Sequence, residues 1–414
     1  MNVERLDVAG MGDPGSAADA LRALAPAGVS VSGTVSEIVA SVRTRGEQAL
    51  LEYVERFDGV TGPLRVAREE LDASLAALDP GVRAGLEVAI ANVRTVAEAG
   101  VAEDKLVELP EGQTVTLREV PVRRAAIYTP GGRHPYPSTV VMGVVTARAA
   151  GVDEVVVCAP GAHPVILAAA ALCGADEVWR MGGAHAVAAF AYGTESVPRV
   201  DVIAGPGSLY VQEAKRQVSG DVGIDGFAGP SDVLVLASGD ADPALVSVDL
   251  VAQAEHGTGT IVALVTDDAA LAEAVALRLA AEPDGDAAAA VVLAASLQEG
   301  LAVAEAFAPE HLELVGAGAE PLAGQVRSAG CVFVGPESGT AFGDYIAGSN
   351  HTLPTGGAAR FTSGLSTRQF RRRMSVVRID GAATALARAG VPVAEAEGFT
   401  RHADSMRVRE NPAG

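Results

Sequence analysis

The chain has 414 residues, of which 49% are hydrophobic and 20% are charged, and its formal net charge is −21. This length allows several domains with buried cores, and the acidic balance argues against a nucleic-acid partner, which needs a basic face. The start of the chain lacks the apolar core of a secretory signal, and the most apolar stretch, "VILAAAALCGA", is too short to span a bilayer. Three scattered cysteines indicate no disulfide framework. We therefore expect a cytoplasmic protein with no membrane partner.

The first part of the chain has helical periodicity, and the part that follows alternates strands with helices. Apolar residues repeat at three and four positions in "VSEIVASVRTRGEQALLEYVERFDG", which stops at Gly59, and again in "PGVRAGLEVAIANVRTVAEAG". From about residue 124, β-branched runs such as "RAAIYTPGG" and "EVVVCAP" alternate with alanine-rich helical segments. Strand-like runs continue as "SDVLVLAS", "TIVALVTD" and "CVFVGP". The alternation predicts an α/β fold with parallel sheets covered by helices.

The loops after these strands are the candidate binding segments, because ligands of parallel sheets bind at the carboxyl ends of strands. Glycine-rich turns, "GG", "GPG" and "AGPS", either let backbone N–H groups approach an anion or are ordinary turns. The dinucleotide fingerprint G-x-G-x-x-G is absent. A long loop, "GPESGTAFGDYIAGSNHTLPTGGAAR", precedes a part at about 366–409 that we expect to be helical. The basic run "RQFRRR" in that part is either a solvated or interface face or a phosphate contact.

Several side chains suited to catalysis or metal binding occur in these segments. Gln253 and His256 lie three apart at the end of an apolar helical run, so they either supply ligands to one zinc ion or form a polar last turn. Glu310 and His311 follow a proline and offer two proton acceptors of different basicity, or else a polar first turn of a helix. Further candidates in the long loop and the last helix are Asp344, His351, Glu397 and His402.

Ordered motifs over most of the chain resemble the histidinol dehydrogenase family. The motifs are "YTPGG…YPS", "AYGT", "AGPGSLYVQEAKRQVSGDVGID", "AGPSD", "QAEH", "APEHLEL", "GDYIAGSNHTLPTGGAAR" and "EGFTRHA". The resemblance implies that the substrate L-histidinol is oxidised through L-histidinaldehyde to L-histidine, the last steps of histidine biosynthesis. It also implies two NAD⁺ per substrate, a zinc ion, and a homodimer.

The same resemblance implies roles for particular residues. The catalytic positions match Glu310, which would activate water, and His311, which would take the hydroxyl proton. The zinc ligands match Gln253, His256, Asp344 and His402. The substrate contacts match Ser231, Gln253, His256, His311, Asp344, Glu397 and His402. The cofactor contacts match Tyr128, His185 and Ser208.

Three positions depart from the family pattern. His185 in "GGAHA" stands where glutamine is usual, Ser208 in "GPGS" where asparagine is usual, and Asp232 in "AGPSD" where glutamate is common. The first two can still form hydrogen bonds with a cofactor. Three other functions therefore stay open: an NAD-dependent dehydrogenase of another small alcohol, a zinc hydrolase that uses Glu310 without NAD, and a silent binding protein.

The resemblance also implies a domain organisation. The fold is α/β, with two related parallel-sheet, incomplete Rossmann-like domains and small helical parts at the two ends. We expect an N-terminal segment at 1–33, a discontinuous first α/β domain at 34–123 and 231–365, and an inserted second α/β domain at 124–230. A C-terminal helical segment at 366–414 would be exchanged between the chains of a homodimer, so that His402 completes the partner's site.

Overall fold

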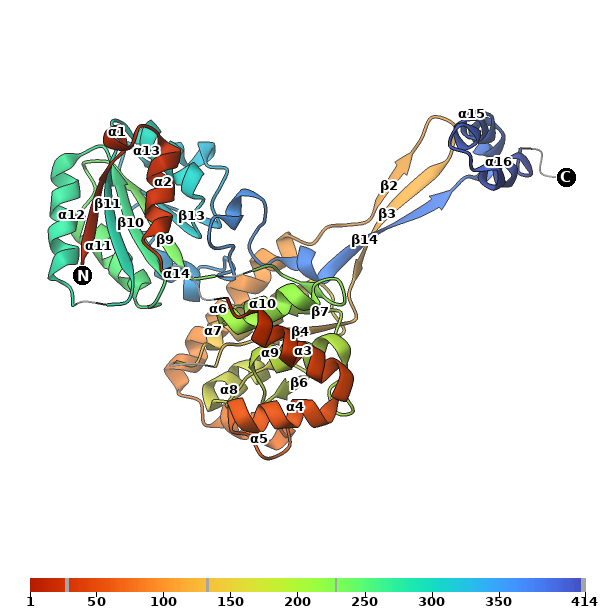
Figure 1. The fold of residues 1–414 in the computed structure, drawn as a ribbon, viewed down its shortest axis with the longest axis horizontal. Helices are drawn as coiled ribbons and strands as arrows, with labels where there is room; N and C mark the ends of the chain where they lie inside the picture. The colour runs from red at the N-terminus through yellow and green to blue at the C-terminus, as the bar shows by residue number, and fades with distance from the viewer. Residues whose placement is uncertain (27–29, 132–133, 228, 284, 411–414) are drawn as a thin grey trace. The chain divides into compact units, whose positions relative to one another are not determined.

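The computed structural model describes residues 1–26, 30–131, 134–227, 229–283 and 285–410. The chain divides into two compact units, which are drawn in Figure 1. Unit 1 comprises Met1–Gly100 and Val122–Phe370, and unit 2 comprises Val101–Pro121 and Arg371–Gly414. Within the described ranges, no helix is long and apolar enough to cross a membrane. Cys158, Cys173 and Cys331 are free thiols.

Unit 1 contains a five-stranded parallel sheet with the order β6-β5-β4-β7-β8. Numbered along the chain, this order reads 3-2-1-4-5, which is that of a doubly wound sheet without its sixth strand. The strands are β4 (Arg124–Tyr128), β5 (Glu154–Cys158), β6 (Glu177–Trp179), β7 (Val202–Ala204) and β8 (Gly223–Ile224). The helices between them are α7 (Pro137–Ala149), α8 (Pro164–Cys173), α9 (Gly183–Tyr192) and α10 (Leu209–Val218).

A six-stranded parallel sheet in unit 1 has the order β1-β11-β10-β9-β12-β13, and thus repeats the 3-2-1-4-5 pattern with β1 added at one edge. Its strands are β1 (Val3–Asp7), β9 (Asp232–Ala237), β10 (Ile261–Thr266), β11 (Ala288–Leu293), β12 (His311–Val315) and β13 (Cys331–Val334). Its helices are α11 (Pro243–Ala254), α12 (Ala269–Ala281), α13 (Leu297–Phe307), η2 (Glu320–Gln325) and α14 (Thr340–Tyr345), followed by η3 (Ala358–Arg360) and η4 (Thr367–Phe370). The two sheets confirm the prediction of two related, incomplete Rossmann-like folds.

The amino-terminal segment joins the six-stranded sheet, although we expected it to form a separate helical part. Strand β1 pairs in parallel with β11, from Val3 opposite Ala289 to Asp7 opposite Leu293. Two helices follow, α1 (Val8–Met11) and α2 (Pro14–Ala23), and Leu21 of α2 joins the core of the six-stranded sheet. The segment belongs to that sheet because β1 covers an edge of β11 that would otherwise expose unpaired backbone groups.

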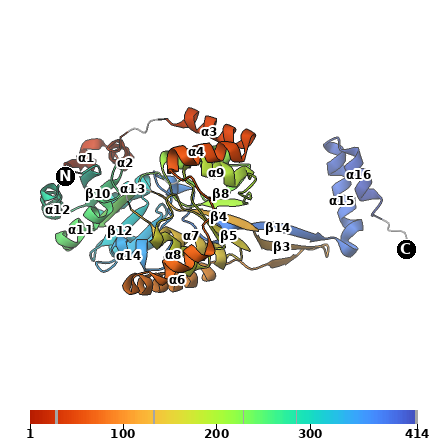
Figure 2. The same cartoon turned by 90° about the horizontal axis from the view of Figure 1, so that it is seen from below.

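The helices at 32–99 pack against the five-stranded sheet, so the predicted grouping of 34–123 with 231–365 is wrong. These helices are α3 (Ser32–Arg45), α4 (Glu47–Tyr53), η1 (Val54–Asp58), α5 (Arg68–Ala76) and α6 (Pro80–Ala99). Val35 and Leu50 share a core with Ala126 on one face of the sheet, and Ile90 shares a core with Ile127 on the other. Figure 2 shows α3 and α4 beside α9. The periodicity showed that these helices have apolar faces but not which sheet would bury them.

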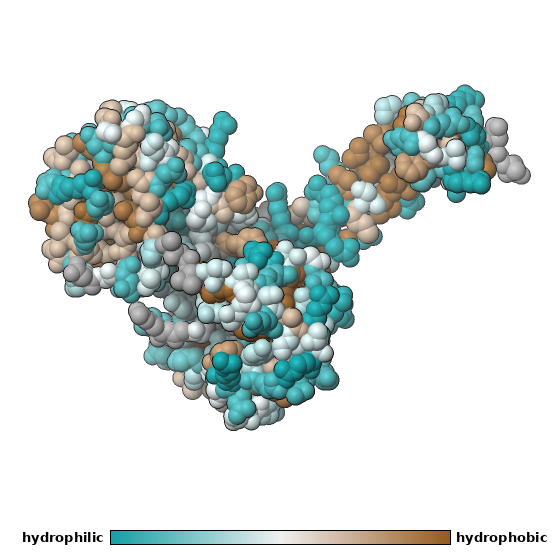
Figure 3. All heavy atoms as spheres, viewed as in Figure 1, coloured by the Kyte–Doolittle hydropathy of each residue, from teal (hydrophilic) through white to brown (hydrophobic). Residues whose placement is uncertain are grey.

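Unit 2 is an antiparallel sheet followed by two helices. The sheet has the order β14-β3-β2, with β2 (Lys105–Glu108), β3 (Thr114–Pro121) and β14 (Arg371–Arg378). A turn, η5 (Asp380–Ala382), leads to α15 (Ala383–Ala396) and α16 (Thr400–Arg407). The expectation of helix from 366 onward therefore fails at β14, which contains the last three residues of "RQFRRR", whereas the first three belong to η4. Arg373 of β14 pairs with Glu119 of β3. Apolar side chains gather on this sheet in Figure 3. Leu106 of β2 and Val377 of β14 are exposed.

Candidate active site

A cavity of about 480 Å³ in unit 1 is lined by residues from both parallel-sheet domains. The five-stranded sheet contributes loops at the carboxyl ends of its strands, with Pro130 after β4 and Ser208 after β7. The six-stranded sheet contributes the amino ends of its strands, with Ser231 before β9 and His311 at the start of β12. The rule that ligands bind at carboxyl ends therefore locates only half of the lining.

The turn before β12 brings Glu310 and His311 to the cavity. Helix α13 ends at Phe307, and Ala308 adopts a left-handed conformation with φ of +46°. Pro309 has no backbone N–H to continue a helix, and β12 begins at His311. The expected helix start at this position is therefore wrong, because the pair lies between the end of one helix and a buried strand.

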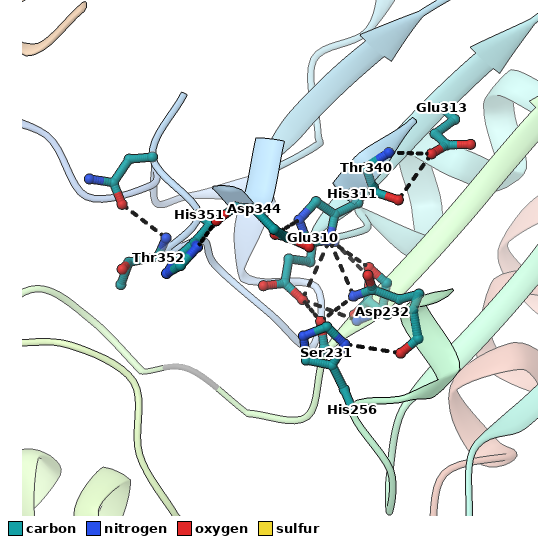
Figure 4. A network of polar contacts seen from close by, with 12 residues as sticks. Ser231, Asp232, His256, Glu310, His311, Glu313, Thr340, Asp344, His351 and Thr352 are labelled. Atoms are coloured by element: carbon teal, nitrogen blue, oxygen red, sulfur yellow. Dashed lines mark hydrogen bonds and ion pairs between the residues drawn. The ribbon is translucent and has the colours of Figure 1, made fainter. Parts of the chain in front are cut away.

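Glu310 is held by reciprocal hydrogen bonds with Asp232 (Figure 4). The Glu310 N–H donates to Asp232 Oδ1 at 2.6 Å, and the Asp232 N–H donates to Glu310 Oε2 at 3.1 Å. The Ser231 hydroxyl donates to the same Oε2. Burial raises the pKa of Glu310 to about 7, although the charge of His311 opposes the rise. A carboxyl group with this pKa exchanges a proton near neutral pH.

His311 lies against Asp344 on one side and the strands on the other. Its Nε2 is 3.6 Å from Asp344 Oδ1, and its Nδ1 is 3.3 Å from the Asp232 carbonyl oxygen and 3.8 Å from Glu310 Oε2. Burial disfavours the charged imidazole, but the nearby carboxylates outweigh burial and raise its pKa to about 9. This is above the ordinary imidazole value of 6.5.

Gln253 and His256 come from the end of α11. Gln253 lies in the last turn and is 2% exposed, and its Nε2 donates to Ser231 Oγ and is 3.4 Å from His311 Nδ1. The helix ends at Ala254, so His256 lies beyond it and lines the cavity, with its Nδ1 3.0 Å from the Gln253 carbonyl oxygen. The two residues therefore approach one cavity, although they do not share a helix face.

Asp344 belongs to α14 and faces the cavity with His351 close behind it (Figure 4). His351 Nδ1 is 2.7 Å from the Asp344 carbonyl oxygen, and His351 Nε2 is 3.4 Å from Thr139 Oγ1. Burial works against ionisation of Asp344, but its hydrogen bond with His311 and the neighbouring histidines hold its pKa below the usual value. Among the residues that the structure describes, no group of three or more His, Cys, Asp or Glu side chains forms a metal site.

Glu397 and His402 belong to unit 2. Glu397 caps the end of α15, His402 lies in α16, and both are exposed. His402 contacts the Phe399 ring, with 5.2 Å between ring centroids. Their assignment as substrate and zinc ligands stays a prediction.

The three predicted cofactor contacts lie at the five-stranded sheet. Ser208 precedes α10 and lines the cavity. The Tyr128 hydroxyl at the end of β4 accepts a hydrogen bond of 2.9 Å from the Gly183 N–H. His185 is 1% exposed, and its Nε2 lies 2.9 Å from Asp58 Oδ2, which also accepts the Gly182 N–H at 3.0 Å. His185 thus contacts the Gly182–Gly183 turn indirectly, through the Asp58 carboxylate that both bind.

Two acids in this region, the half-buried Asp58 and the buried Glu313, were not predicted. Asp58 meets His185 across 127 residues of sequence, and Glu313 lies two residues after His311 on β12. No local pattern marks Asp58. The alternation of "HLEL" in a strand would have shown that Glu313 shares a face with His311, had the strand been recognised.

Two doubly wound sheets that share a cavity with a buried acid–base pair define an α/β enzyme. The family profile described as histidinol dehydrogenase matches residues 25–410. The histidinol dehydrogenase of Nocardia farcinica is 45% identical over 95% of each chain, and that of Parasynechococcus marenigrum is 44% identical over 92% of this chain and 91% of its own. The crystal structure of histidinol dehydrogenase from Elizabethkingia anophelis superimposes with a TM-score of 0.90 at 29% identity, covering 98% of both chains. The chain belongs to the histidinol dehydrogenase family and is an oxidoreductase.

Proposed function

We propose that this chain is a zinc-dependent L-histidinol dehydrogenase of cytoplasmic histidine biosynthesis. It oxidises L-histidinol through L-histidinaldehyde to L-histidine and uses two NAD⁺. The observation that carries the proposal is the buried pair of Glu310 and His311, which borders the cavity beside Ser231 and Asp344. The pair supplies two proton acceptors, as a reaction with an alcohol step and an aldehyde step requires.

The four side chains assigned to zinc have the donor types that this ion prefers. They offer imidazole nitrogen from His256 and His402, carboxylate oxygen from Asp344 and amide oxygen from Gln253. His256 and Asp344 line the cavity, and Gln253 hydrogen-bonds Ser231, which lines it as well. When bound, zinc supplies an electrophilic anchor for the amine and imidazole of the substrate.

The loop after β7 suits a dinucleotide. Doubly wound sheets bind dinucleotides where the strand order reverses, which here is between β4 and β7. The loop is tight at Gly207, where an added Cβ would lie 2.6 Å from Val211 Cγ1, and the amino terminus of α10 follows. A helix amino terminus favours the anionic phosphates of a cofactor. When bound, NAD⁺ supplies the hydride acceptor. We assign Tyr128 and Ser208 to contact it and His185 to act through the Gly182–Gly183 turn.

The hydrogen bonds of the two catalytic residues suggest which atoms move protons. His311 Nδ1 faces the Asp232 carbonyl oxygen, so the neutral imidazole keeps its proton on Nδ1 and takes the hydroxyl proton of the alcohol at Nε2. Because the pKa of His311 is raised to about 9, this neutral form is the minor one at neutral pH, and its share increases as the pH rises toward 9. Glu310 Oε2 accepts bonds from Ser231 and Asp232, which leaves Oε1 to take a proton from the water that attacks the aldehyde. The enclosed position of the pair also keeps the reactive aldehyde from bulk water.

The site is complete only in a homodimer under this proposal. Glu397 and His402, which belong to unit 2, would be supplied by one copy to the cavity of the other. Unit 2 carries exposed apolar side chains that a second copy could cover: Leu106, Met374, Val377, Val393 and Phe399.

The Glu310→Gln variant tests the division of roles. It should keep the oxidation of histidinol to the aldehyde within about tenfold, and it should lower the oxidation of added histidinaldehyde by about 100-fold or more, since it removes only the base for water. Both rates are followed by NADH absorbance. The exposed Glu337→Gln is the matched control. Equal losses in both oxidations would contradict the assignment.

A further inference from the structure

The five-stranded sheet domain contains an enclosed ion pair that the reaction steps above do not use. Lys215 of α10 is fully buried, and its Nζ pairs with Asp225, which follows β8. Only two of the 31 basic residues of this chain are lysines, Lys105 and Lys215. Lys105 is exposed on β2, whereas Lys215 is buried. The compact ammonium group of a lysine fits the position of Lys215, and the larger, planar guanidinium of an arginine would direct its hydrogen bonds differently.

Both members of the pair bind the backbone of one glycine. Asp225 Oδ2 accepts the Gly205 N–H at 2.7 Å, and Lys215 Nζ donates to the Gly205 carbonyl oxygen at 3.0 Å. Asp225 Oδ1 accepts from the same ammonium group. The ion pair thus fixes the orientation of the peptide groups on either side of Gly205, which directly follows β7.

The conformation of Gly205 requires glycine and brings the loop close to β4. Its φ is +122°, and an added Cβ would lie 2.1 Å from the carbonyl oxygen of Tyr128. The next residues, Pro206, Gly207 and Ser208, line the cavity. A rotation of the Gly205 peptide groups would therefore displace the part of the lining that we assign to the cofactor.

We propose that Lys215 and Asp225 are positioning residues that hold the Gly205–Ser208 loop in the form that receives the diphosphate-linked part of NAD⁺. The inference rests on the proposed function, because the loop is a cofactor loop only in that case. A buried ion pair is a poor choice for stability alone, since well-packed apolar residues often replace such a pair without loss. Its bonds to the two peptide groups that flank Gly205 give it a geometric task instead.

The Lys215→Met variant tests the proposal, with Lys105→Met as the matched control at the only other lysine. The dissociation constant of NAD⁺ is measured by calorimetry and that of NADH by fluorescence, on the full chain loaded with zinc. We expect Lys215→Met to weaken both at least about tenfold, with kcat at saturating NAD⁺ within about threefold of the wild type. Lys105→Met should match the wild type.

A second variant keeps the test decisive if Lys215→Met does not fold because Asp225 is left unpaired. Lys215→Met/Asp225→Asn removes both charges, and its thermal unfolding reports whether it folds. If this folded variant, or folded Lys215→Met, binds NAD⁺ as tightly as the wild type, the pair is structural and the inference is overturned. If the wild type itself fails to bind NAD⁺, the proposed function falls first, and the inference falls with it.

Discussion

Replacing Glu313 by glutamine should change how the stability of the protein depends on pH. Glu313 is 1% exposed on β12, and its Oε1 accepts the N–H and hydroxyl of Thr340 at 2.8 and 3.1 Å. These bonds hold the start of α14, the helix that carries Asp344. Burial, and then the charge of Asp249, raise the pKa of Glu313 from 4.5 to about 7.

The sign and size of the effect follow from this shift. Because the folded pKa lies above the unfolded one, the folded protein binds more protons between pH 4.5 and 7. The stability that neutral Glu313 contributes is complete below pH 4.5 and is lost as the pH rises through 7. The raised pKa corresponds to about 3 kcal/mol. Glu313→Gln cannot titrate, so between pH 4.5 and 8 it should gain about 3 kcal/mol relative to the wild type.

Urea unfolding followed by circular dichroism at a series of pH values measures this difference. The quantity to compare is the free energy of unfolding of the variant minus that of the wild type at each pH. Glu337→Gln, an exposed carboxyl after β13, provides a baseline that should stay flat. If the curves for Glu313→Gln and the wild type run parallel from pH 4.5 to 8, burial does not keep Glu313 neutral and the reasoning fails.

Three further outcomes follow from the geometry. Gly205→Ala should lower the free energy of unfolding by at least about 2 kcal/mol in urea titrations, because its Cβ meets the carbonyl of Tyr128; an unchanged midpoint would contradict the loop conformation. His256→Ala and His402→Ala should each be inactive alone, and co-expressed chains should recover about a quarter of wild-type activity, since only mixed dimers contain one intact site. If co-expression restores no activity, His256 and His402 serve the same site from one chain, and the proposed exchange between the two chains is wrong. Ser231→Ala should slow the aldehyde step by about tenfold or more, and rates equal to the wild type would remove Ser231 from the network.

The strands with uninterrupted β-branched runs were predictable, and those with unusual composition were not. β5, β9 and β10 contain the uninterrupted apolar runs VVVC, VLVLA and IVALV because helices cover both faces of each sheet, and such runs identify buried parallel strands. β11 begins with three alanines and resembles a helical segment, although it lies between β1 and β10. β12 contains two polar residues that interrupt its apolar pattern: His311 lines the cavity, and Glu313 accepts hydrogen bonds from Thr340 at the start of α14.

The candidate site was predictable only where a motif carried it. Glu310, His311, Gln253 and His256 lie in short motifs, and all four meet at the cavity region. The partnership of His185 with Asp58 depends on packing between α9 and η1, and no spacing rule links positions 127 residues apart. The pairing of β1 with β11 was equally unpredictable from local sequence. It depends on which edge of the six-stranded sheet has unpaired backbone groups in the folded chain.

The amount of NADH formed per histidinol consumed, with and without a chelator, tests the central claim most directly. The proposed function predicts two NADH per substrate, loss of activity on chelation, and recovery when zinc is restored. One NADH per substrate, or full activity in the presence of the chelator, would contradict it. If no NADH forms in the presence of zinc, the chain has one of the other functions that its sequence left open: a dehydrogenase of another small alcohol, a zinc hydrolase or a silent binding protein.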